Sequence, residues 1–194
     1  MRLFIAIDLD EAARQAIAGE QTRLRATLGE TRSQLSWVRP DHLHLTLVFL
    51  GEVAESDAHA ATDAIGVAIA QRSFDLAFSG IGVFPPRGAP SVLWLGVTVG
   101  ARESIDLQRQ LADRARRLNI PLETRPFHPH LTLARWRTSR TSRPSDRTRM
   151  LDAGSDRVIA RVRVEHATLY QSRLSPAGPT YTALARATLT GSER

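Results

Sequence analysis

The four-residue word His-Leu-Thr-Leu occurs twice in the chain, at residues 44–47 and at residues 130–133. In a β-strand, side chains two positions apart point to the same face. Each copy therefore predicts a strand with histidine and threonine on one face and two leucines on the other. A buried leucine face fixes the register, because a slip by one residue would bury the histidines instead. The repeat thus restricts the fold to one with two comparable strands, each packed on a hydrophobic core.

The segments around the two copies alternate between strand and helix patterns. Strands are predicted at residues 2–8, 42–50, 74–83, 92–97, 130–136, 158–170 and 181–189, and helices at about 10–28, 55–71 and 104–118. This order predicts two α/β lobes, each with one motif and an outer helix layer on one sheet face. No linker separates the lobes, so residues 1–194 are expected to form a single bilobal domain around a central cleft. The pattern does not reveal how the chain crosses between the lobes.

Composition excludes several classes of site. The chain has no cysteine, which excludes disulfides, thiolate nucleophiles and zinc–thiolate sites. All of its basic residues are arginines, so the lysine of a P-loop is missing and P-loop nucleotide hydrolysis is excluded. Asp8 cuts short the apolar run at the N-terminus, and no segment is long enough to span a bilayer. We therefore expect a cytoplasmic protein with no membrane partner, and the net charge of +6 is compatible with a polyanionic one.

The paired motifs carry groups suited to chemistry at phosphorus. Histidine changes its charge near neutral pH, so one imidazole can accept the proton of an attacking water while a second gives a proton to the leaving ribose oxygen. His44 and His130 are the candidates for these two roles. The hydroxyls of Thr46 and Thr132 can donate hydrogen bonds to the non-bridging phosphate oxygens. A strained 2′,3′-cyclic phosphate suits this apparatus, and no metal or other cofactor is expected.

The chain resembles the RNA 2′,3′-cyclic phosphodiesterases of the 2H phosphoesterase (LigT-like) superfamily over nearly its whole length. Beside the paired His-x-Thr-x motifs, the likeness rests on residues 2–8, 37–38, 49–51, 82–85, 92–94 and 125–127. The resemblance implies a bilobal α+β fold with two pseudo-symmetric lobes of antiparallel sheet. It also implies hydrolysis of cyclic RNA ends to 2′-phosphomonoesters, with His44 as the proton donor and His130 as the proton acceptor.

Arg135 and Phe4 are further candidates for binding substrate. The resemblance suggests that Arg135 contacts phosphate, but strict alternation places it on the leucine face, so the contact needs a bulge or a strand end. Phe4 could stack on a base if its face lines the cleft, and core packing is the alternative. Ser91 stands where relatives often have arginine, and Arg87 could replace that contact. The arginine-rich segment 137–150 is either a basic arm beside the phosphate or a solvated loop.

His42 and His128 each precede a motif histidine by two residues, where relatives often show asparagine, arginine or lysine. They either lie in solvent before their strands begin, or they tune the motif histidines or contact phosphate. A third reading is that His42, His44, His128 and His130 converge as nitrogen ligands of a metal site.

The expected partner is RNA with a 2′,3′-cyclic phosphate end, for example a tRNA fragment, bound by a monomer. Two alternatives use the same site: a 2′,5′ RNA ligase that needs no ATP, and a phosphodiesterase for small cyclic nucleotides. An alternative of another class is a basic RNA-binding module without catalysis.

Overall fold

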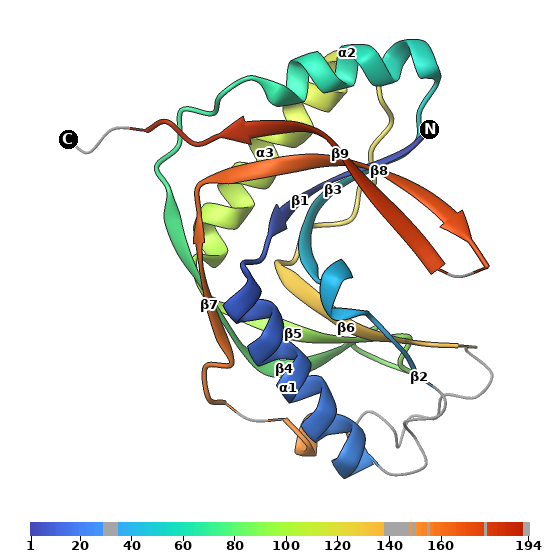
Figure 1. Cartoon of the computed structure of the whole chain (residues 1–194), viewed down its shortest axis with the longest axis vertical. Coiled ribbons are helices and arrows are strands. Elements are labelled where there is room, and N and C mark those ends of the chain that lie inside the picture. The colour runs from blue at the N-terminus through green and yellow to red at the C-terminus, as the bar shows by residue number, and fades with distance from the viewer. Residues whose placement is uncertain (29–34, 138–147, 149, 155, 177, 192–194) are drawn as a thin grey trace.

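The computed structural model describes residues 1–28, 35–137, 148, 150–154, 156–176 and 178–191. These residues form two antiparallel β-sheets with helices on their outer sides (Figure 1). We call the part with the four-stranded sheet, which carries the first motif, the first lobe. The part with the five-stranded sheet, which carries the second motif, is the second lobe. The predicted bilobal α+β fold is confirmed, including the antiparallel pairing of both sheets.

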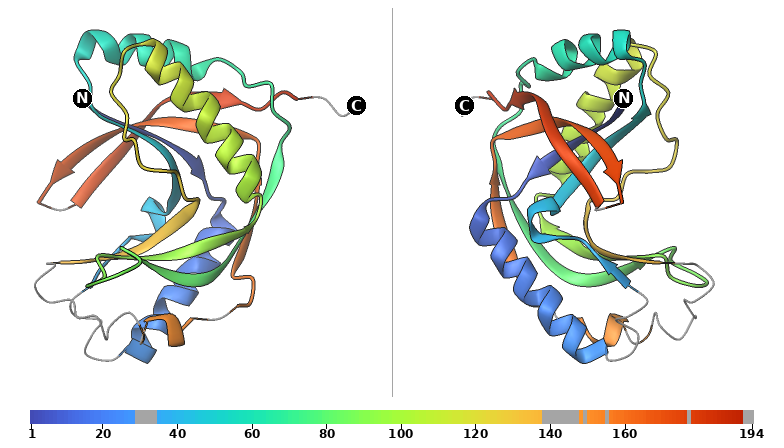
Figure 2. Two further views of the ribbon diagram at one scale, coloured as in Figure 1. Left: turned by 180° about the vertical axis from the view of Figure 1, so that it is seen from behind. Right: turned by 45° about the vertical axis from the view of Figure 1, so that its right-hand side comes forward.

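The sheet of the first lobe places its motif strand at an edge. In order across the sheet, the strands are β3 (His44–Glu52), β1 (Arg2–Asp8), β8 (His166–Ser175) and β9 (Gly178–Thr188). Every neighbouring pair is antiparallel. β8 and β9 form a long hairpin that projects from the body of the molecule (Figure 2).

The sheet of the second lobe places its motif strand between two neighbours. In order, the strands are β2 (Leu35–Trp37), β6 (His130–Trp136), β5 (Val92–Val99), β4 (Phe74–Phe84) and β7 (Ala160–Val164). A short 3₁₀ turn, η2 (Pro40–His42), leads from β2 directly to β3. The two motif-bearing sheets are therefore joined immediately before the first motif.

The helices lie at opposite ends of the molecule. They are α1 (Glu11–Leu28), α2 (Glu55–Gly66) and α3 (Ala101–Arg117). Figures 1 and 2 show α2 and α3 together over the first lobe and α1 alone beside the second. α1 follows β1 along the chain but packs against β7, whereas α3 follows β5 but packs against β3. The chain thus crosses between the lobes after each of these strands.

The hydrophobic core runs through both lobes as one contiguous cluster. The leucines at positions 45, 47, 131 and 133 belong to it and are at most 3% exposed. Helix α3 contributes its buried stripe, which includes Leu107 and Leu111 at helical spacing. A shared core supports the prediction of one domain over residues 1–194, which stays a prediction. No helix in the described ranges is long and apolar enough to cross a membrane.

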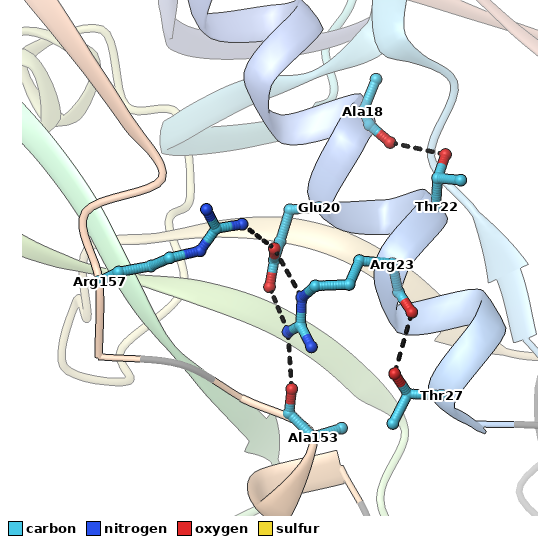
Figure 3. A network of polar contacts seen from close by, with 7 residues as sticks. All are labelled: Ala18, Glu20, Thr22, Arg23, Thr27, Ala153 and Arg157. Atoms are coloured by element: carbon cyan, nitrogen blue, oxygen red, sulfur yellow. Dashed lines mark hydrogen bonds and ion pairs between the residues drawn. The ribbon is translucent and has the colours of Figure 1, made fainter.

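A buried carboxylate fastens α1 to the second lobe (Figure 3). Glu20 is only 2% exposed, and its oxygens accept hydrogen bonds from Arg23 at 2.6 and 3.0 Å and from Arg157 at 3.0 Å. Arg23 also donates to the carbonyl oxygen of Ala153 at 2.6 Å. The hydrogen bond from Arg23 is the largest cause of the lowered pKa of Glu20. The charge of Glu20 is therefore paired despite its burial, and it links α1 to the segment before β7.

Two predicted elements differ from the structure. The strand predicted at residues 158–170 is two strands, because the chain changes sheets at Glu165: β7 pairs with β4, and β8 pairs with β1. The helix predicted at 55–71 ends at Gly66. The guanidinium of Arg114 donates to carbonyl oxygens at the end of that helix, and Ile69 then pairs with the end of β9. The remaining predicted elements are confirmed to within a few residues at their ends.

Candidate active site

The two motif strands repeat the same pattern of exposure. Over their first seven residues, β3 and β6 have identical sequences of buried, half-buried and exposed positions. His44, Thr46, His130 and Thr132 are half-buried, and the leucines between and after them are buried. The predicted parity of histidine and threonine on one face is therefore confirmed in both lobes.

Both strands also contain a β-bulge at the last leucine of the motif. Thr46 and Val48 pair with consecutive residues of β1, which leaves Leu47 without a partner there. Leu133 is skipped in the same way where β6 pairs with β5. A bulge reverses the direction of the side chains that follow it.

The bulge in β6 turns Arg135 from the leucine face to the cleft face. Ala134 after the bulge is fully buried, and Arg135 is exposed and lines the cleft. Gln21 of α1 supports this bulge, because its buried side-chain amide donates to the carbonyl oxygens of Leu133 and Val38 at 3.0 and 2.9 Å. Strict alternation would have placed Arg135 on the leucine face, and the bulge explains why it faces the cleft instead. The equivalent residue of β3 is Phe49, which is 52% exposed and lines the same cleft.

A cavity of about 630 Å³ lies between the two lobes. Its lining includes both motif histidines and both motif threonines, together with Arg135. No hydrogen bond to either threonine hydroxyl occurs among the described residues, so both hydroxyls are available to a ligand. The two copies of the motif therefore face one common space, which is large enough for a nucleotide.

Each motif histidine is held by the backbone two residues before it. The Nδ1 atom of His44 lies 2.8 Å from the carbonyl oxygen of His42, and that of His130 lies 2.7 Å from the carbonyl oxygen of His128. A carbonyl oxygen can only accept a hydrogen bond, so Nδ1 carries the hydrogen in both rings. The Nε2 atom of each ring is then the nitrogen that can exchange a proton with a ligand.

Both rings have a lowered pKa in the cleft. Burial lowers the pKa of His44 to about 4, against the opposite effects of its hydrogen bond to the His42 carbonyl and of the charge of Asp8. Burial likewise lowers the pKa of His130, against the effect of its hydrogen bond to the His128 carbonyl. The positive charge of Arg135 contributes to the lowered pKa of both rings. Arg135 therefore acts on both lobes, although it belongs to the second.

Aromatic rings surround the two histidines differently. The ring of Phe4 stacks on His44 with centroids 4.9 Å apart, whereas Phe84 meets His130 edge-on at 5.0 Å. Phe4 borders the cavity but is only 4% exposed. The expected stacking of Phe4 on a base stays a prediction, and the ring packs against His44, Phe49 and the two tyrosines.

The extra histidines lie beside the motif histidines. The ring of His42 packs on Tyr181 at 4.8 Å, and the ring of His128 is roughly parallel to that of His130 at 6.4 Å. Charge on His42 lowers the pKa of His44, and charge on His128 lowers that of His130. Among the described residues, no group of three or more histidine, aspartate or glutamate side chains is placed to hold a metal ion. The four histidines therefore do not form the metal site considered above.

Ser91 and Arg87 lie apart from the cavity lining. Ser91 closes the turn after β4 by donating to the carbonyl oxygen of Phe84, and neither it nor Arg87 borders the cavity in the described part of the chain. Of the arginine-rich segment 137–150, residues 138–147 and 149 lie outside the described residues. Sequence reasoning missed Tyr181 of β9, which borders the cavity and touches His42, His44 and Phe4. Its alternation in β9 was visible, but no sequence signal placed that hairpin beside the first motif.

Comparison with known proteins identifies the family of the chain. The profile of the 2′-5′ RNA ligase superfamily matches residues 12–175. An RNA 2′,3′-cyclic phosphodiesterase of Methanothermobacter thermautotrophicus is 33% identical over 184 residues, covering 94% of this chain and 95% of the relative. The enzyme of the same name from Thermus thermophilus is 34% identical over 203 residues, covering 98% and 91%.

Solved structures agree as well. The crystal structure of Escherichia coli LigT with 3′-AMP has a TM-score of 0.73 and 32% identity, covering 97% of this chain and 98% of that one. The crystal structure of a Thermus thermophilus protein has a TM-score of 0.74 and 30% identity, covering 100% of both chains. The resemblance noted from the paired motifs is confirmed, and the chain belongs to the 2′-5′ RNA ligase superfamily of 2H phosphoesterases.

Proposed function

We propose that this protein hydrolyses 2′,3′-cyclic phosphate ends of RNA to 2′-phosphomonoesters, without a metal ion. The observation that carries the proposal is the single cavity lined by both motif histidines and both motif threonines. The relatives named RNA 2′,3′-cyclic phosphodiesterase support the choice of substrate. The LigT structure with 3′-AMP supports the binding of a nucleotide with a phosphate on its ribose.

In the proposed reaction, the Nε2 atom of His130 accepts a proton from a water molecule as its oxygen attacks phosphorus. The bond between phosphorus and the ribose O3′ breaks, and His44 gives the Nε2 proton of its imidazolium to that oxygen. The product carries a 2′-phosphate and a 3′-hydroxyl, and the two histidines exchange their protonation states through solvent before the next turnover. Thr46, Thr132 and Arg135 stabilise the negative charge that builds on the non-bridging oxygens.

The proton-donor role of His44 requires a charge that burial disfavours. With a pKa of about 4, His44 is neutral at pH 7 in the free protein. A bound phosphodiester is an anion, and a nearby anion raises the pKa of a histidine. Substrate binding should therefore be accompanied by uptake of a proton, which calorimetry in buffers of different ionisation enthalpy can measure. Binding without proton uptake would contradict the assignment of His44 as the acid.

The direct test uses an oligoribonucleotide that ends in a 2′,3′-cyclic phosphate, incubated with the protein in EDTA. We expect a 2′-phosphate product, identified by its resistance to a 3′-specific phosphatase. A 3′-phosphate product, or a reaction that starts only after a metal ion is added, would contradict the proposal. A protein that binds the oligonucleotide with no turnover would instead be the non-catalytic RNA-binding module.

The family name favours one second candidate, which is ligation through a 2′,5′ bond. In that reaction, a 5′-hydroxyl of a second RNA end takes the place of the water, and the same two histidines exchange the same protons. Adding an RNA with a free 5′-hydroxyl to the assay separates the two, because ligation gives a longer product that ribonuclease digestion identifies as 2′,5′-linked.

A further inference from the structure

The chain contains two tyrosines, and both contact the ring of Phe4. Tyr170 of β8 lies nearly parallel to Phe4 at 5.3 Å, and Tyr181 of β9 meets it edge-on at 5.0 Å. Tyr181 also meets the ring of His44 edge-on, with centroids 5.5 Å apart. One of the two tyrosines therefore touches a motif histidine directly.

The two hydroxyls have different surroundings. The hydroxyl of Tyr170 donates a hydrogen bond to the carboxylate of Asp8 at 2.5 Å, and Asp8 also accepts a hydrogen bond from Thr168 at 2.7 Å. The hydroxyl of Tyr181 has no hydrogen bond to any residue that the structure describes, and Tyr181 borders the 630 Å³ cavity. Tyr170 is absent from that lining. The hydroxyl of Tyr170 is thus engaged by Asp8, whereas that of Tyr181 is available to a ligand in this cavity.

Positive charge faces the free hydroxyl. Burial raises the pKa of Tyr181, and the charges of Arg135 and Arg2 act on its hydroxyl in the opposite direction. Arg135 is the same residue whose charge acts on both motif histidines. The hydroxyl of Tyr181, Arg135 and the two imidazoles therefore surround one region of the cavity. A neutral O–H donor beside a guanidinium is suited to binding an anion.

We propose that the Tyr181 hydroxyl donates a hydrogen bond to a non-bridging oxygen of the cyclic phosphate, on the side of the phosphate that faces His44. This inference rests on the proposed function and adds a phosphate ligand from β9, outside both motifs. The second lobe supplies Arg135 to the phosphate, and the first lobe supplies Tyr181. The hydroxyl stays protonated throughout, so it contributes a hydrogen bond and no proton transfer.

The two tyrosines provide a matched pair of variants for the test. Tyr181→Phe and Tyr170→Phe each remove one hydroxyl and keep the ring that packs against Phe4. We expect Tyr181→Phe to lower kcat/KM on the order of 10²-fold, as for the loss of one donor to a charge that develops in the transition state. Tyr170→Phe should leave kcat/KM close to that of the unmodified protein. The loss in Tyr181→Phe should be equal for 2′,3′-cyclic AMP and for a cyclic-ended oligonucleotide, since both contain the reacting phosphate.

Three outcomes would overturn the inference. Equal losses in both variants would mean that removing either hydroxyl disturbs the site indirectly, and that Tyr181 has no contact with the phosphate that Tyr170 lacks. A loss confined to the oligonucleotide would mean that Tyr181 binds a phosphate further along the RNA. Unchanged kinetics in Tyr181→Phe would likewise reject it.

Binding of inorganic phosphate separates this inference from the proposed function. Calorimetric titration with phosphate needs no turnover, and we expect Tyr181→Phe to weaken phosphate binding roughly 10-fold, the value of one hydrogen bond of about 1.4 kcal/mol. Tyr170→Phe should bind phosphate as the unmodified protein does. If the unmodified protein binds phosphate but does not open cyclic ends, the proposed function fails while the phosphate titration still decides the role of Tyr181.

Discussion

β3 and β6 share their first four residues, their pattern of burial and the position of their bulge, yet the residues that their bulges turn toward the cleft differ. In the first lobe this residue is Phe49, and in the second it is Arg135. The shared part places two imidazoles and two hydroxyls around one space. The residues that the bulges turn toward the cleft make its two sides different, because Arg135 contributes a cation on one side and Phe49 an apolar ring on the other. In the reaction proposed above, this asymmetry would let a symmetric pair of motifs bind an asymmetric substrate in one orientation.

The strongest test of the shared part is the removal of each motif histidine. His44→Ala and His130→Ala should each lower kcat by roughly 10²–10⁴-fold, because each removes one proton transfer. The double variant should cost about as much as either single one, since the two groups act as a unit. Single-turnover hydrolysis of a cyclic-ended oligonucleotide measures both. If one single variant kept most of its activity, the two lobes would not contribute equally to the chemistry.

The outer helices extend the comparison to stability. In the second lobe, α1 is fastened by Glu20 with Arg23 and Arg157, whereas in the first lobe Arg114 joins α3 to α2 through backbone carbonyls. Replacing both Arg23 and Arg157 by methionine leaves a buried carboxylate unpaired. We expect the free energy of unfolding, measured in urea, to fall by roughly 3–5 kcal/mol.

Adding Glu20→Leu to these two substitutions provides the control. A protein is often as stable as before when apolar side chains of similar volume replace a buried group of paired charges, so this triple variant should recover most of the lost stability. A loss below about 1 kcal/mol in the double variant would show that water reaches Glu20 and that its pairing matters little.

The burial of His44 should make the protein sensitive to acid. The pKa of His44 is about 4 in the folded protein, and in the unfolded chain it should be near the ordinary histidine value of 6.5. Between pH 4 and pH 6.5 the unfolded chain therefore binds the proton more readily than the folded protein does. Stability should therefore fall as the pH drops from 6.5 to about 4, by on the order of 3 kcal/mol. His44→Gln should flatten this part of the curve, and His59→Gln, at an exposed position of α2, serves as the control. An unchanged curve in His44→Gln would assign the acid sensitivity to other groups.

Arg135→Gln tests the cation that makes the two sides of the cleft different. Hydrogen bonds to charged groups are worth roughly 1.5–3 kcal/mol, so kcat/KM should fall about 10- to 100-fold. The pKa of both His44 and His130 should rise, because the charge of Arg135 lowers both. Nuclear magnetic resonance titration of the two rings measures this. Phe49→Leu is the matched variant in the other lobe, and it should change the pKa of neither histidine. If Arg135→Gln raised the pKa of His130 alone, the charge of Arg135 would act only within the second lobe.

The smallest effect is expected from His128→Asn. The charge of His128 lowers the pKa of His130, so its removal should raise that pKa and move the acidic limb of the pH–rate profile to higher pH. His42→Asn makes the same comparison at His44. A profile that keeps its shape in both variants would mean that the extra histidines do not tune the motif pair.

The motif strands, the parity of their side chains and the histidine–threonine sets could be predicted because a period of two leaves only one arrangement with buried leucines. Arg135 could not be placed from the sequence, since a bulge adds a residue without any signature in the letters Leu-Ala-Arg. The split of segment 158–170 was missed for a similar reason. An alternating pattern continues through Glu165, although the two halves pair with different sheets.

Contacts between distant strands were beyond the reach of the sequence. Phe4 was expected to meet a base or the core, but nothing in the pattern of residues 2–8 shows that its ring stacks on His44. Tyr181 was missed because its role depends on the hairpin of β8 and β9 lying against β1, a pairing that spans most of the chain. Such long-range packing decides which aromatic residues serve the site and which serve the core.

The hydrogen bond that holds Nδ1 of each motif histidine is accepted by a main-chain carbonyl oxygen, which every amino acid has. His42 and His128 orient the neighbouring imidazoles through their carbonyl oxygens, so the identity of their side chains is free to change while the rings stay in place. These two positions are therefore suited to adjusting the working pH of the enzyme, since a replacement there alters the electric field at the ring and leaves its orientation alone.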